Sequence, residues 1–326
     1  MSFLKINNLS VDYKMRRETV YAAKNVNIEV SKGEILGLVG ESGSGKSTVG
    51  NAIINLIDEP GKVSSGSILL GEINIHENPE NIVKYRGKKV GLIFQDPQTS
   101  LNPIFTIGEQ LIETIQTHLD LNTKEAKTKA VNLLREVGIK DAEKRFDNYP
   151  HQFSGGMRQR VVISLALCCE PELLIADEPT TALDVTIQAQ LLDLLKKLKS
   201  SVVSKTSILF ITHNLGIVRE IADRIIVMYA GNIVEEGTVD DVFSKPLHPY
   251  TFGLIQSLPE FNIENRKKIQ PIPGNVPNMN KLPTGCYFHP RCNLANDNCK
   301  VNKPELTKVL ENRKSRCFEY NKLMWC

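Results

Sequence analysis

A membrane-spanning helix needs an apolar run of about 18 residues. The sequence contains no such run, so we do not expect it to cross a bilayer. Its first residues, 1–5, lack the apolar core and the small-residue cleavage site of a signal peptide. The net charge of +3 is too small to indicate nucleic-acid binding by itself. These absences favour a cytoplasmic protein, in which the seven cysteines are expected to be thiols or metal ligands rather than disulfides.

The chain is long enough for more than one domain. Its 326 residues are 41% apolar and 24% charged, which are ordinary proportions for a folded protein with a sizeable core. Near Thr238 the composition changes, and the remainder is richer in Pro, Asn and Cys, with few long apolar runs. We therefore predict two domains, at residues 1–238 and 239–326.

The strongest motif runs from Gly40 to Thr48 and matches G-x-x-x-x-G-K-[ST]. The short apolar run 35–39 before it predicts a buried strand, and the apolar positions after it fall on one face of a helix. Strand, glycine loop and helix in this order are the context of a phosphate-binding loop, whose backbone N–H groups and helix N-terminus bind an anion. The predicted ATP-binding residues of this loop are Gly40, Ser42, Gly43, Gly45, Lys46, Ser47 and Thr48.

Further elements surround the loop. Period-two apolar positions predict antiparallel strands at 3–11 and 24–30, and Tyr13, on the loop leaving the first of them, could stack on a purine ring. An apolar strand at 89–94 ends on Gln95, before a proline-bounded loop. From 107 to about 144 the pattern becomes helical, with Gly138 as a C-cap.

Three polar segments follow the helical region. Ser154 is expected to cap a helix, so that Ser-Gly-Gly presents free backbone N–H groups to an anion. Asp177 and Glu178 come directly after the buried strand 173–176, and His213 follows the strand 208–211. In open α/β sheets the carboxyl ends of the strands are where ligands bind.

In this order the motifs resemble those of the ATP-binding cassette (ABC) ATPases, over residues 3–240. Two positions of the signature depart from the usual family sequence, Met157 and Arg158. The resemblance implies an α/β fold: an ABC ATPase core with a mixed central sheet and an N-terminal antiparallel β subdomain, a helical subdomain at about 97–165, and a small cysteine-containing C-terminal domain. The motifs that carry it are the phosphate loop, the Q-loop Gln95, the signature Ser154–Gln159, the acidic motif Leu173–Glu178, the D-loop Ala182–Asp184 and the switch His213.

The resemblance also implies what each residue does. Lys46 would hold phosphates, Glu178 would polarise the attacking water, and His213 would orient water and γ-phosphate. Two cassettes of this family close head-to-tail, so Ser154 and Gly156 would contact the ATP bound to a partner. The Mg²⁺ ligands implied are Ser47, Gln95 and Asp177. The further ATP-binding residues implied are Gln95, Gly155 and Asp184, and Tyr13 is added from its position on the loop.

A narrower resemblance, to dipeptide/oligopeptide permease ATP-binding subunits, extends the match to about residue 320. It rests on 94–97 with 99–103, on 248–251, and on 285–286 with 288–292. It implies ATP hydrolysis coupled to uptake of di- and oligopeptides across the inner membrane, with the chain peripheral on the cytoplasmic face. The implied partners are two transmembrane permease subunits, a second ATP-binding subunit, identical or related, and, indirectly, an extracytoplasmic substrate-binding protein.

Two alternatives stay open. Relatives of this architecture also move nickel and other small solutes. A soluble ABC ATPase acting on ribosomes or DNA is disfavoured, because the chain has one phosphate loop and only a short segment between Thr48 and Ser154. We expect no nucleic-acid partner.

Four cysteines gather near the C-terminus with the spacing C-x5-C-x6-C-x17-C, at Cys286, Cys292, Cys299 and Cys317. Their density suggests a metal site, although the spacing lacks the C-x2-C pair of many zinc sites, and thiolates alone do not separate zinc from an iron–sulfur cluster. The alternative is that they are small buried apolar residues. Similarity to permease ATPases that carry a [4Fe–4S] cluster favours that cofactor. Cys168 and Cys169 are expected to pack in the core.

Overall fold

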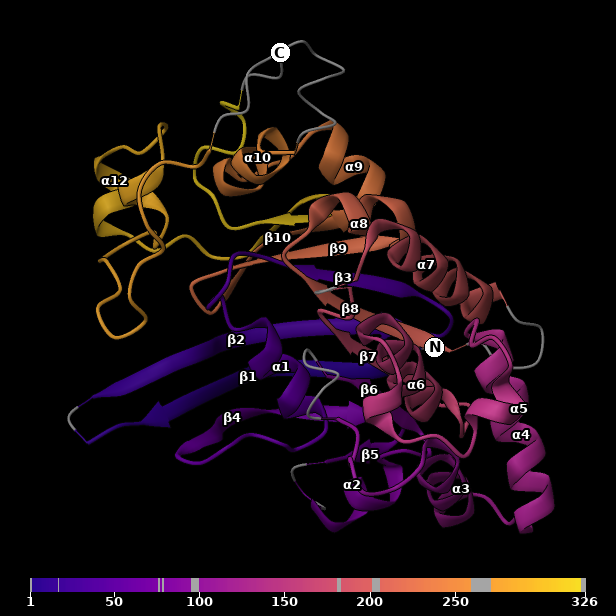
Figure 1. The fold of residues 1–326 in the computed structure, drawn as a ribbon. Helices are drawn as coiled ribbons and strands as arrows, with labels where there is room; N and C mark the ends of the chain where they lie inside the picture. The colour runs from indigo at the N-terminus through magenta and orange to yellow at the C-terminus, as the bar shows by residue number, and fades with distance from the viewer. Residues whose placement is uncertain are drawn as a thin grey trace. The chain divides into compact units, whose positions relative to one another are not determined.

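The computed structural model describes residues 2–16, 18–75, 77, 79–94, 100–180, 183–200, 206–258 and 271–323 (Figure 1). Gln95, the loop residues 96–99 and Ala182 therefore lie outside the described residues. The chain divides into two compact units, which we describe separately. Unit 1 holds Met1–Leu4, Val30–Glu34 and Glu77–Leu209, and unit 2 holds Lys5–Glu29, Ile35–His76 and Phe210–Cys326. The boundary predicted near Thr238 stays a prediction.

The first sheet has four strands in the order β2-β1-β4-β5. Apolar side chains at alternate positions, among them Ile6, Val26 and Ile28, are buried, as the period-two pattern predicted. β1 continues to Lys14, so Tyr13 lies within the strand, and the expectation of a loop there was wrong. The reason is that pairing extends β1 beyond its last apolar residue. The bounds are β1 (Ser2–Lys14), β2 (Thr19–Ser31), β4 (Gly61–Leu70) and β5 (Ile73–Asn74).

Unit 2 also contains neighbouring strands of a second sheet, the first of which leads to the phosphate loop. β3 (Ile35–Val39) pairs in parallel with β9 (Arg224–Tyr229). β9 forms an antiparallel hairpin with β10 (Asn232–Thr238). The helices of this part are α1 (Lys46–Ile53), after the loop, and α8 (Leu215–Ile221), whose Val218 packs against Gly37 of β3.

In the described part of the C-terminal region, which spans residues 239–326, two strands join the same sheet. β10 pairs antiparallel with β12 (Arg313–Ser315), which pairs with β11 (Thr307–Leu310). Neither strand carries an apolar pattern from which it could be predicted, since most of their side chains are polar. The helical segments described in this region are α9 (Val239–Ser244), α10 (Pro249–Gln256), the 3₁₀ turn η2 (His289–Arg291) and α12 (Asp297–Val301).

A buried ion pair connects β12 with β10. Glu235 is fully buried, and one of its carboxylate oxygens lies 2.7 Å from Nη2 of Arg313. The same carboxylate accepts hydrogen bonds from the backbone N–H groups of Leu247 and His248, at 2.7 and 2.9 Å. Because a buried charge is tolerated only with such partners, Glu235 fixes where the chain enters α10.

Unit 1 combines parallel strands with helices. β6 (Val90–Ile93) pairs in parallel with β7 (Leu173–Asp177), and β8 (Ser207–Thr212) leads from this unit along the chain into unit 2. The predicted helical region is confirmed, and α4 and α5 lie side by side in Figure 1. The helical segments are α2 (Pro79–Tyr85), α3 (Ile107–His118), α4 (Thr123–Glu136), α5 (Ala142–Arg145), η1 (Pro150–Gln152), α6 (Gly155–Leu167) and α7 (Val185–Ser200).

Local sequence explains where these helices begin and end. Thr106 with Glu109 and Asn122 with Glu125 form capping boxes that start α3 and α4. Gly138 takes a φ of 82° just after α4, as a C-terminal glycine should. Cys168 and Cys169 are buried after α6, which confirms their predicted packing role. None of the helices described in the structure is long and apolar enough to span a membrane.

Candidate nucleotide-binding site

The phosphate loop follows β3 and ends at the start of α1, as predicted. Two of its glycines have no room for a side chain. A Cβ on Gly40 would lie 2.3 Å from the carbonyl oxygen of Met228, and one on Gly45, where φ is 97°, would lie 2.0 Å from that of Ala22. The loop is thus folded tightly against its neighbours and ends at the N-terminus of α1, the position at which a glycine-rich loop binds phosphate.

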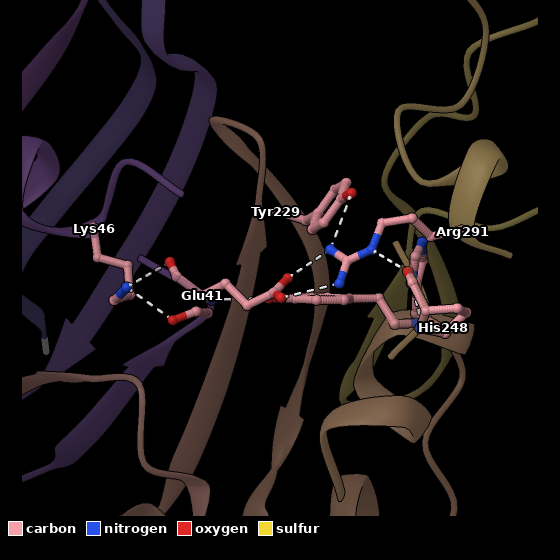
Figure 2. Close-up of polar contacts among 8 residues, drawn as sticks. Glu41, Lys46, Tyr229, His248 and Arg291 are labelled. Atoms are coloured by element: carbon pink, nitrogen blue, oxygen red, sulfur yellow. Dashed lines mark hydrogen bonds and ion pairs between the residues drawn. The ribbon is translucent and has the colours of Figure 1, made fainter. Parts of the chain in front are cut away.

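Lys46 places its ammonium group within this loop. Its side chain is buried, and Nζ donates to the carbonyl oxygens of Gly40 at 2.8 Å and Glu41 at 3.0 Å (Figure 2). The adjacent Ser47 is exposed, with its hydroxyl at the first turn of the helix. A positive charge and the backbone N–H groups at one helix N-terminus can hold the phosphates of a nucleotide.

Glu41 of the loop is held from the C-terminal region. Its N–H donates to the hydroxyl of Tyr250, at 2.8 Å. Its carboxylate oxygens accept from Nη1 and Nη2 of Arg291, at 2.8 and 3.0 Å, as the dashed lines in Figure 2 show. The sequence did not assign Arg291 or Tyr250 to the site. Each lay in a segment singled out by resemblance, but no short-range pattern connects those segments with Glu41.

The acidic motif lies in unit 1. Asp177 ends β7, and Glu178 follows it with a φ of 47°. This left-handed conformation is unfavourable for a residue with a Cβ, and such strained residues cluster at active sites. The carboxylates thus stand at the carboxyl end of a buried parallel strand, as the sequence predicted.

The signature and the D-loop border one groove of unit 1. Ser154 caps α6, accepting from the N–H of Met157 at 3.4 Å, which confirms the predicted cap. Asp184 caps α7, accepting from the N–H of Ile187 at 2.9 Å. Ser154, Gly156 and Asp184 all line a groove of about 910 Å³. Gly155 is exposed, and a Cβ there would meet no atom within 4 Å, so this surface is open.

Two other predicted residues belong to unit 2. His213 is exposed directly after β8, followed by Asn214, which caps α8. Tyr13 is half-buried, and its ring fills the space above Gly61, where an added Cβ would come within 2.5 Å of it.

The four C-terminal cysteines line one small cavity in unit 2. Its volume is about 10 Å³, enough for about one water molecule. Burial raises the pKa of Cys292 to about 11 and that of Cys317 to about 12, so these thiols are neutral at physiological pH. Among the described residues, which include all four, no three His, Cys, Asp or Glu side chains are arranged to hold a metal ion. The donor types suit a thiolate-bound metal, but their arrangement in this conformation does not.

Comparison with known proteins agrees with this geometry. Residues 23–181 match the family model described as ABC transporter, and residues 234–299 match the one described as oligopeptide/dipeptide transporter, C-terminal region. Among solved structures, the dimeric ATP-binding cassette MJ0796 in a post-hydrolysis state with ADP and Pi is 30% identical. It has a TM-score of 0.65 and covers 72% of this chain and 98% of its own. The fold and the phosphate loop thus define an ABC ATPase.

Full-length relatives identify the family more closely. The oligopeptide transport ATP-binding protein AppD of Bacillus subtilis is 50% identical over 98% of this chain and 97% of its own. The dipeptide transport ATP-binding protein DppD of Escherichia coli is 44% identical over 97% of this chain and 96% of its own. The chain belongs to the family of oligopeptide and dipeptide transport ATP-binding proteins.

The buried imidazole of His248 predicts a pH-dependent stability. Burial, and then the charge of Arg316, lower its pKa to about 3, and Nδ1 accepts from the N–H of Tyr250 at 3.1 Å. The unfolded chain, with a pKa of about 6.5, binds the proton first as pH falls. The contribution of neutral His248 is therefore complete above about pH 6.5 and is lost progressively toward about pH 3.

The test is to measure the urea midpoint of unfolding against pH for wild type and His248→Asn. Asparagine also caps helices but does not titrate, so the variant should lose less stability than wild type between about pH 6.5 and pH 4.5. Parallel profiles for the two proteins would refute the role of His248.

Proposed function

We propose that this chain is the ATP-hydrolysing subunit of an ABC importer that moves di- and oligopeptides across the inner membrane. The observation that carries this proposal is 50% identity with an oligopeptide transport ATP-binding protein along nearly the whole of both chains. The match of residues 234–299 to an oligopeptide/dipeptide transporter region favours peptides over nickel or another small solute.

Hydrolysis needs the γ-phosphate to be positioned and its charge neutralised, with little covalent chemistry from the protein. Lys46 and the loop N–H groups bind the phosphates. Ser47, Gln95 and Asp177 are the proposed ligands of a Mg²⁺ ion, which would supply the remaining neutralisation when bound. Glu178 draws the proton of the attacking water and His213 orients the water, so that an O–P bond forms and the bond to ADP breaks.

The site is completed by a second cassette. We place Ser154, Gly155, Gly156 and Asp184 against the ATP of a partner subunit, identical or related. Support comes from the exposure of Ser154 and Gly155, from the groove that Ser154 and Gly156 share with Asp184, and from the dimeric state named for the solved cassettes. The other proposed partners are two transmembrane permease subunits and, through them, an extracytoplasmic substrate-binding protein. The chain would then be peripheral on the cytoplasmic face of the membrane.

Replacing Glu178 with Gln tests the mechanism. The amide cannot accept the proton of water but keeps the volume, so ATP binding should persist while hydrolysis falls at least about 100-fold. The measurement is phosphate release, with ATP binding in parallel, in a reconstituted complex whose partner ATPase is inactive.

Glu170→Gln is the matched control, because Glu170 also has a positive φ, of 53°, in the same unit, and pairs with Lys129 outside every nucleotide motif. It should hydrolyse ATP at the wild-type rate. Near-normal turnover by Glu178→Gln would show that Glu178 is not the catalytic carboxylate.

We propose that the four C-terminal cysteines bind one [4Fe–4S] cluster, which has a structural role. Its support is four thiols around one cavity and the hydrogen bond from the N–H of Glu319 to Sγ of Cys317, 3.3 Å. Such a bond is favourable for a charged thiolate ligand. Binding would deprotonate thiols whose pKa is raised, so metal binding and the packing of this region would be coupled.

Metal analysis after anaerobic purification decides this proposal. About four irons and matching sulfide per chain are expected for the cluster, whereas about one zinc would replace it with a zinc site. If the chain contains no metal, the cysteines are buried packing residues and the cluster proposal is wrong.

A further inference from the structure

We infer that Arg291 is a positioning residue for the phosphate loop: it acts through Glu41 to hold the loop in its nucleotide-binding conformation. The inference rests on the proposed ATP binding at this loop and adds a role that the sequence motifs do not assign. It makes the C-terminal region a part of the nucleotide site rather than an appendage to it.

The contact between the two residues is specific. Both terminal nitrogens of Arg291 bind the carboxylate of Glu41, at 2.8 and 3.0 Å, in the paired geometry that a planar guanidinium favours. The Arg291 side chain is only 5% exposed. Its Nε also donates to the carbonyl oxygen of Pro273 at 2.8 Å, so the guanidinium is fixed from a second side.

The surroundings hold the arginine rigidly. Its guanidinium carbon lies 5.8 Å from the ring centre of Tyr229 and 5.9 Å from that of Phe288, within the range of cation–π attraction. These two rings meet edge to face at 5.2 Å, and both pack on Tyr250, whose hydroxyl binds the N–H of Glu41. Arginine and tyrosine therefore reach the same loop residue from one packed cluster.

Glu41 connects this cluster to the phosphate-binding groups. Its carbonyl oxygen accepts from Nζ of Lys46 at 3.0 Å and from the N–H of Ser44 at 3.2 Å. A shift of Glu41 would thus move the loop lysine. A carboxylate in an anion-binding loop also repels phosphate unless its charge is neutralised, and Arg291 neutralises it.

The test is the affinity of the full-length chain for Mg–ATP, measured by calorimetry, for wild type and three variants. Arg291→Met should raise Kd by about tenfold or more, because Glu41 then keeps its charge but loses its partner. The double variant Glu41→Gln with Arg291→Met should return Kd to within about threefold of wild type, because it removes that charge. Lost packing alone would not be rescued by a change at Glu41.

Arg316→Met is the control. Arg316 lies in the same region, but its hydrogen bonds go to the carbonyl oxygens of Ile233 and Pro304, away from the loop. Its Kd should stay within about twofold of wild type. Should Arg291→Met fail to fold, Arg291→Lys replaces it. Lysine keeps the charge but not the paired geometry, and should raise Kd by about threefold.

The outcomes separate the two proposals. Wild-type affinity in Arg291→Met and Arg291→Lys would overturn the role of Arg291 and leave the proposed ATPase intact. If the double variant has a Kd as high as that of Arg291→Met, Arg291 does not act through the charge of Glu41. This result would also overturn the proposed role of Arg291. A wild-type chain that does not bind Mg–ATP overturns the proposed function, and this inference with it.

Discussion

The fixed shape of one short loop is the constraint on which the site depends. Free backbone N–H groups bind phosphate only if the loop does not relax to satisfy them internally. Here Gly40 and Gly45 are packed against carbonyl oxygens that leave no space for a Cβ, and Lys46 is buried with its ammonium group bound to the loop's own carbonyls. Contacts from outside the loop also bind it, at Glu41.

The C-terminal region provides several of those contacts in unit 2. β12 extends the sheet that contains β3, and the buried pair of Glu235 with Arg313 fixes the start of α10. Buried ion pairs contribute little net stability, but they favour one arrangement over others because an unpaired buried charge is costly. The arrangement favoured here brings Tyr250 and Arg291 to Glu41.

Much of the core and the phosphate loop could be predicted from sequence, because their signals are local. Apolar alternation predicted the first strands, and Gly138 and Ser154 were recognised as helix caps from residue type alone. The strands at 307–310 and 313–315 could not be predicted, since they are short and mostly polar and form by pairing, β12 with β10 and β11 with β12. The contact between Glu41 and Arg291 joins residues 250 positions apart, which no periodicity reveals. The cysteine spacing predicted proximity, and all four do line one cavity, but it did not predict how closely they pack.

Hydrogen exchange of the loop amides tests the central claim most directly, that a loop held by the C-terminal region binds nucleotide. The N–H of Glu41 is bonded to Tyr250, so it should exchange slowly even without nucleotide. The N–H groups of Ser42 and Gly43, in the exposed part of the loop, should exchange fast and become protected at least about tenfold when Mg–ATP is added. Fast exchange at Glu41, or no change at Ser42 and Gly43 with saturating Mg–ATP, would contradict the account.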